Sequence, residues 1–170
     1  GGELSWVKKR RFKPLSSGKT LGEFSGDVDE ALAIRARIAD KEDGPGARRE
    51  LGDALARAGR HADAAAAYVK AASAAPDDAD IQLRLGTARG LAGDAAGAET
   101  ALVRSTELAP KSAAGWRALS RVREQRGDLD GAAKALSAMI EKAEGGDTPQ
   151  ARARVERLRA EAARRAGGEE

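Results

Sequence analysis

The sequence contains no cysteine, which excludes disulfide bonds and thiolate metal sites. It has no run of about 18 apolar residues, so we expect no membrane span and no secretory leader in this chain. Aromatic residues are few, asparagine is absent, and alanine supplies most of the apolar content. Because alanine favours helix and allows close helix packing, the composition predicts thin stacked helices. The dominance of alanine, arginine and glycine and the absence of asparagine indicate a GC-rich coding sequence, which is typical of a bacterial source.

Groups that could perform catalysis are scarce. His61 is the only histidine, and we expect a surface imidazole in the turn after Gly59. One imidazole without cysteine supplies neither a metal cage nor a base with an orienting partner. Residues 16–20 end like a phosphate-binding P-loop, but Lys13 stands where that motif needs a glycine. We therefore expect a non-catalytic protein with no cofactor and no metal.

The basic charge lies at the two ends of the chain. Residues 1–25 hold six basic and two acidic residues, a net charge of +4, and residues 148–166 also hold six and two. The whole chain carries only +3, so its central part is slightly acidic. The overall charge therefore gives no support to nucleic-acid binding.

Three marks recur between residues 45 and 144 at a fixed step of 34 residues. The first is a Leu-Gly-type pair, the second a glycine and the third an alanine. They are Leu51-Gly52, Leu85-Gly86 and Leu119-Ser120; Gly59, Gly93 and Gly127; and Ala64, Ala98 and Ala132. Such even spacing indicates a repeat array, and hence a binding scaffold rather than a catalyst.

These residues resemble the tetratricopeptide repeat (TPR) pattern Trp-x2-Leu-Gly-x2-Tyr, Ala-x3-Phe, Pro. Trp116, Tyr68 and the prolines Pro76 and Pro110 add to the match. Some positions depart from the pattern. Arg48 and Gln82 replace the Trp, and Arg89 and Arg123 replace the Tyr. The resemblance implies an all-α, right-handed TPR solenoid of antiparallel helix pairs.

We divide the chain on this basis into an arm, a repeat body and a cap. The arm, 1–25, is a basic, disordered or extended linker, and 26–44 is a half-repeat helix whose apolar stripe covers the first full repeat. That stripe consists of Val28, Ala31, Leu32, Ile34 and Ile38. Three repeats follow over 45–147 (45–78, 79–112 and 113–147), then a capping helix over 148–166 and a tail, 167–170. The expected helix pairs are 46–58 with 62–74, 79–92 with 95–108, and 113–126 with 129–143.

Caps and turns are predicted from residue type. The recurring glycines Gly59, Gly93 and Gly127 suit a left-handed helix end, while Asp94, Asp128, Thr148 and the run Asp77–Asp80 suit helix starts. In 79–92 the residues expected inside are Ile81, Leu85, Ala88 and Ala92. In the capping helix the residues expected inside are Ala151, Val155, Leu158, Ala162 and Ala166. The arginines expected to point outward are Arg152, Arg157, Arg159, Arg164 and Arg165.

The resemblance implies a concave groove lined by the first helix of each pair, where a peptide would lie. The matching positions are Arg49, Asp53, Leu83, Thr87, Leu91, Arg117 and Arg121. Arginines at both ends favour a ligand with an acidic side chain or a C-terminal carboxylate. The alternative is that these are ordinary solvated residues.

One subfamily is disfavoured. TPR domains that clamp the acidic tails of chaperones use Lys, Asn and Arg at positions that match Arg49, Asp53, Arg84, Ala114 and Ala118 here. Asp53 would repel a carboxylate and the alanines cannot bind one.

The arm offers a second hypothesis. Its basic run is flanked by aromatic residues and consists of Trp6, Val7, Lys8, Lys9, Arg10, Arg11, Phe12 and Lys13. It could bind an anionic membrane surface or nucleic acid, with the repeats as a spacer, or remain a solvated linker. A third idea is self-association, with the arm in its own or a neighbour's groove. We expect a cytoplasmic protein, membrane-associated if a missing flanking sequence anchors it.

Overall fold

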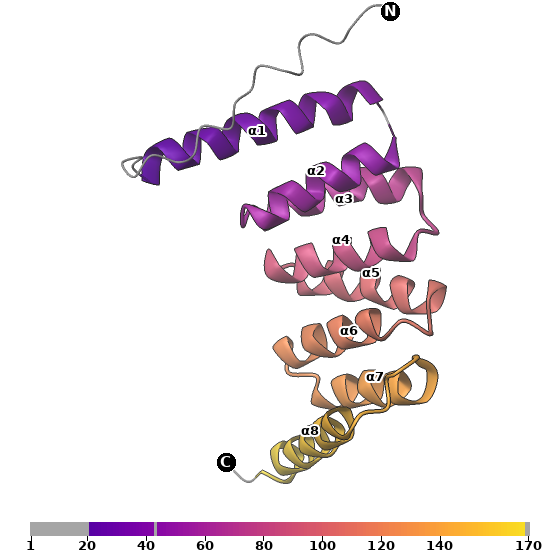
Figure 1. The fold of residues 1–170 in the computed structure, drawn as a ribbon. Coiled ribbons are helices and arrows are strands. Elements are labelled where there is room, and N and C mark those ends of the chain that lie inside the picture. Colours follow the sequence, from indigo (N-terminus) through magenta and orange to yellow (C-terminus); the bar gives the residue numbers. More distant parts are fainter. Residues whose placement is uncertain (1–20, 43, 169–170) are drawn as a thin grey trace, which may run out of the picture.

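The computed structural model describes residues 21–42 and 44–168, and the regular elements within these ranges are all α-helices. They are α1 (Leu21–Glu42), α2 (Pro45–Arg57), α3 (His61–Ala74), α4 (Ala79–Leu91), α5 (Ala95–Leu108), α6 (Ala113–Gln125), α7 (Leu129–Lys142) and α8 (Pro149–Gly167). Figure 1 shows them piled in chain order, with α1 at one end and α8 at the other. The expectation of an all-α solenoid is confirmed.

The bounds of α2 to α8 lie within one residue of those expected from the sequence. The first helix differs, because α1 begins at Leu21, inside the range that we assigned to the arm. Gly26 and Asp27, which we placed at its start, therefore lie inside it. A glycine ends a helix only where its backbone turns left-handed, and Gly26 continues the helix instead.

The turns inside the three pairs are closed by glycines with positive φ, as predicted. Gly59, Gly93 and Gly127 have φ of 75°, 89° and 79°. A Cβ at any of the three would meet nothing within 4 Å, so the backbone conformation alone selects glycine there. These residues end the first helix of each pair and reverse the chain into the second.

Aspartates cap the second helices of two pairs. The Asp94 carboxylate accepts a hydrogen bond from the Gly97 backbone N–H at 2.9 Å, and Asp128 accepts one from Gly131 at 2.8 Å. Asp78 caps α4 in the same way, and Thr148 caps α8. In the first pair Arg60 stands at the cap position of α3 without a side-chain cap bond.

Asp94→Ala should therefore lower the free energy of unfolding by about 1 kcal/mol, because a helix N–H loses its acceptor. Asp130→Ala is the matched control, since Asp130 is an exposed aspartate in the first turn of α7. It should cost no more than about 0.5 kcal/mol. Urea denaturation followed by circular dichroism measures both. Equal losses in the two variants would contradict the capping role.

Close packing of the two helices of a pair explains the glycine in the recurring Leu-Gly pair. A Cβ placed on Gly52 would lie 2.5 Å from Tyr68 Cε1, and one on Gly86 would lie 2.5 Å from Leu102 Cγ. The two helices of a pair therefore approach so closely that a side chain at this position collides with the partner helix. In the third pair the small Ser120 takes the same place and is buried.

The interior is a row of three apolar clusters rather than one core. The clusters centre on Tyr68, Leu102 and Leu136 in turn, and all three side chains are buried. Successive helices pack on one another, and α4 also packs on α6. Each helix thus depends mainly on its neighbours in the sequence, as in other solenoids.

The terminal helices bury less than expected. In α1, Leu32 and Ala39 are buried, but Val28, Ile34 and Ile38 are 44–45% exposed, so most of the expected stripe does not cover the first repeat. In α8 Val155 and Leu158 are buried, and the five arginines predicted to point outward are exposed. Two alanines expected inside are exposed, one at the C-cap of α4 and one in the last turn of α8. They are Ala92 and Ala166.

Candidate functional site

The predicted groove residues lie on the first helices of the three pairs. Helix α2 carries Arg49 and Asp53, α4 carries Leu83, Thr87 and Leu91, and α6 carries Arg117 and Arg121. The two halves of this surface differ. In the α2–α4 half the charges pair with one another, whereas in the α6–α8 half they line open cavities.

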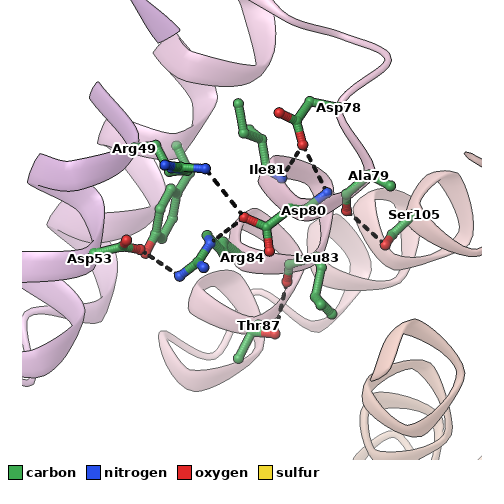
Figure 2. A network of polar contacts seen from close by, with 11 residues as sticks. Arg49, Asp53, Asp78, Ala79, Asp80, Ile81, Leu83, Arg84, Thr87 and Ser105 are labelled. Carbon is green, nitrogen blue, oxygen red and sulfur yellow. Dashed lines mark hydrogen bonds and ion pairs between the residues drawn. The ribbon is translucent and has the colours of Figure 1, made fainter. Parts of the chain in front are cut away.

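A polar network joins α2 to α4 (Figure 2). The Asp53 carboxylate accepts hydrogen bonds from the Tyr68 hydroxyl at 2.6 Å and from Arg84 Nη1 at 2.8 Å. Arg84 also donates to Asp80 at 2.7 Å, and Arg49 lies 3.7 Å from the same Asp80 carboxylate. The figure shows Asp80 between the two arginines. Asp53 and Arg49 therefore bind other side chains of this protein.

Tyr68 and Arg84 both hold their protons firmly in this network. Burial raises the pKa of the Tyr68 phenol well above its ordinary value, and the hydrogen bond to Asp53 raises it further. The hydrogen bond with Asp80 raises the pKa of Arg84. Both side chains thus remain protonated hydrogen-bond donors to the aspartates near neutral pH.

The α4–α6 junction holds a small apolar cavity of about 50 Å³. Leu91 at its edge is 58% exposed, and Leu102 of α5 forms its floor. Gly90 leaves the space open, since a Cβ there would lie 3.3 Å from Val122 Cγ2. Thr87 lies at the same cavity but donates its hydroxyl to the Leu83 carbonyl. Leu83 is half-buried and packs on the cluster around Leu102.

A larger cavity of about 360 Å³ lies where α6, α7 and α8 meet. Arg117 and Arg121 line it from α6, and Arg121 also lines the apolar cavity at α4. Across it, Arg154 of α8 pairs with Glu124. Arg121 has no acidic partner among the residues that the structure describes, and Arg117 donates only to the Ala113 carbonyl at 3.3 Å. Two cations thus line the larger cavity, and one of them, Arg121, also lies beside the apolar cavity.

Several features of this surface could not be assigned from the pattern. The repeat pattern did not indicate that Tyr68 and Arg84 bind Asp53, or that Arg154 and Glu124 pair at the larger cavity. The 34-residue period gives the positions of these side chains but not which of them pair. A usable signal was Gly90, because a glycine inside a helix costs about 1 kcal/mol and so points to a close approach or an opening.

Other candidates from the sequence give no further site. The basic arm residues 6–13 lie outside the described ranges. His61 is the first residue of α3, directly after the turn, and is half-buried with its Nδ1 atom enclosed. In the described ranges no helix is long and apolar enough to cross a bilayer.

Two family models match the sequence, and both are described as tetratricopeptide repeat. One matches residues 55–122 and the other residues 24–79, so the second includes most of α1. No curated protein sequence matches the chain.

Solved structures share the architecture. The Sgt2 TPR domain from Aspergillus fumigatus superposes with a TM-score of 0.65 at 24% identity, over 74% of this chain and 83% of that one. The crystal structure of MamA gives 0.63 at 22%, over 70% of this chain and 66% of MamA. The first TPR of Spaghetti (RPAP3), bound to the HSP90 peptide SRMEEVD, gives 0.62 at 18%, over 70% and 93%. At these identities the likeness concerns the fold.

Proposed function

Because the chain belongs to the tetratricopeptide repeat family, we propose that it is a non-catalytic scaffold that binds an extended segment of a partner protein on the α4–α6–α8 side of its groove. TPR repeats form protein-interaction modules, and an adaptor role in a larger assembly follows from that class. The observation that carries the finer proposal is the position of Arg121. It lies between an apolar cavity and a polar one, with no acidic partner in the described part of the chain.

The ligand chemistry follows from the two cavities. An apolar side chain of the ligand fits beside Leu91 and Val122, where the surface is apolar and already open. A carboxylate fits beside Arg117 and Arg121, since guanidinium groups bind carboxylates through paired hydrogen bonds. We therefore propose a ligand with an apolar residue close to an acidic group, either a side chain or a C-terminus.

The proposed contact surface is narrower than the groove predicted from the sequence. Arg49 and Asp53 are excluded from it, because they pair with Asp80, Arg84 and Tyr68. Leu91, Arg117 and Arg121 remain, and Leu83 and Thr87 support them from α4. The RPAP3 domain of similar fold holds an acidic peptide, which supports an acidic ligand as a class and leaves its identity open.

The test is selection of peptides by the full chain from a displayed random library. We expect the enriched peptides to pair an apolar residue with an acidic one. Their affinity should fall about tenfold or more in Arg117→Glu/Arg121→Glu and also in Leu91→Glu, because each change removes one half of the contact.

The matched control is Arg157→Glu/Arg164→Glu, which reverses two exposed charges on the outer side of α8. It should leave affinity within about twofold. Equal losses in both double variants would show a nonspecific charge effect and would overturn the proposal. Binding that disappears when residues 1–20 are deleted, or that collapses with salt in every variant, would favour the basic arm as the binding element.

A further inference from the structure

Helix α1 exposes an apolar surface at the open end of the solenoid. Five large apolar side chains are exposed in the described ranges, and three of them are on this helix: Val28, Ile34 and Ile38. Ile34 and Ile38 are four residues apart and so share one side of α1. They line a shallow hollow with Arg37, Asp40 and Lys41. The buried side of the helix, with Leu32 and Ala39, faces α2 instead.

The charge of this helix is opposite to that of the segment before it. Residues 21–42 carry six acidic and three basic residues, a net charge of −3. Residues 1–20 carry six basic residues and one acidic residue, a net charge of +5. That segment also contains Leu4, Trp6, Val7, Phe12 and Leu15. It thus combines apolar side chains with the charge that complements α1.

The length of the segment is sufficient to reach the exposed isoleucines. Residues 1–20 end where α1 begins, and Ile38 lies 17 residues further on, roughly 26 Å along a helix. Ten extended residues, from 16 back to 6, span about 33 Å. The sequence Ser16-Ser17-Gly18 between them suits a reversal of the chain. Trp6 and Val7 can therefore reach Ile34 and Ile38 without strain on the connection.

We propose that residues 6–15 fold back along α1 in the same chain and cover Ile34 and Ile38, closing the N-terminal end of the solenoid. The basic run then lies along the acidic helix, and the aromatic residues cover the apolar hollow. A solenoid needs its last apolar surface covered at each end, and α8 does this at the other end. The arm is in this case an end cap, and its charge is partly neutralised within the chain.

Disulfide trapping tests this contact directly, because the chain has no cysteine of its own. The pair Ser5→Cys and Lys41→Cys places one thiol beside Trp6 and one beside the hollow. Under mild oxidation we expect an intramolecular disulfide, seen as a fast-migrating monomer on a non-reducing gel. The control pair is Ser5→Cys with Arg157→Cys, on the outer side of α8. It should form the bond about tenfold more slowly, since only diffusion of the arm brings those thiols together.

A second set of variants tests whether the apolar hollow causes the contact. Ile34→Glu/Ile38→Glu should slow the trapping at least about tenfold, while circular dichroism stays unchanged because both side chains are exposed already. Val69→Glu, an exposed apolar residue on α3, should have no effect. A disulfide-linked dimer in place of the monomer would mean that a second copy supplies the arm. That result, or equal trapping in the two cysteine pairs, would overturn the proposal.

Discussion

Gly86→Val should lower the free energy of unfolding by about 3 kcal/mol, because the new side chain has no space between α4 and α5. A Cβ at this position already lies 2.5 Å from Leu102 Cγ and 3.0 Å from the Ala98 carbonyl oxygen. Leu102 is fully buried, and the Ala98 atom at the contact belongs to the backbone. Neither can move aside at low energetic cost. Valine also adds a branched side chain to a helix. Urea denaturation followed by circular dichroism gives the difference.

The control for this substitution is Gly46→Ala. Gly46 is also helical, in the first turn of α2, but a Cβ there would meet nothing within 4 Å. Alanine favours the helix, so Gly46→Ala should leave stability unchanged or raise it by up to about 1 kcal/mol. If Gly86→Val costs no more than the control, α4 and α5 do not approach as closely as described.

Asp53→Ala should lower the free energy of unfolding by about 2 to 3 kcal/mol, the second largest effect we expect from one substitution. The Tyr68 side chain is buried, and its hydroxyl would lose its carboxylate acceptor. Arg84 would lose one of its two aspartates but keep Asp80, and it is 39% exposed, so it contributes little to the loss. Denaturant titration measures the effect.

A double-mutant cycle separates the hydroxyl from the charge. Tyr68→Phe removes the donor, so Asp53→Ala should cost less in that background by about 1 kcal/mol or more. Asp63→Ala is the matched control, because Asp63 is exposed and pairs with the exposed Arg60 at 2.7 Å. It should cost no more than about 1 kcal/mol. Additive effects of the first two substitutions would mean that the Tyr68–Asp53 hydrogen bond does not hold α2 and α3 together.

The repeat period was sufficient to predict the helices of the body. Gly93 with Asp94, and Gly127 with Asp128, end one helix and begin the next through local backbone chemistry, which depends only on nearby residues. The start of α1 was not predictable in the same way. Gly26-Asp27 repeats the Gly-Asp sequence of the turns at 93–94 and 127–128, but here the backbone stays helical from Leu21 through both residues, so these two residues alone do not determine a turn.

The sequence pattern predicted which residues lie on the first helices, but not which of their side chains pair with one another. The pattern places Arg49, Asp53, Arg117 and Arg121 alike on first helices, and it treats them as equivalent. The structure separates them, because Asp80 and Arg84 come from the next repeat to pair with the first two. Pairing of this kind depends on side chains about 30 residues apart in sequence, which a single-repeat pattern does not describe.

Because α4 packs on α6, amide hydrogen exchange should reveal whether a peptide occupies the groove. In a linear array, opening starts at the ends, and amide hydrogens there exchange with solvent before those in the middle. A peptide held jointly by α4 and α6 must leave before these two helices can separate. Its presence should therefore slow deuterium uptake in the second and third repeats and leave the uptake of α1 unaltered.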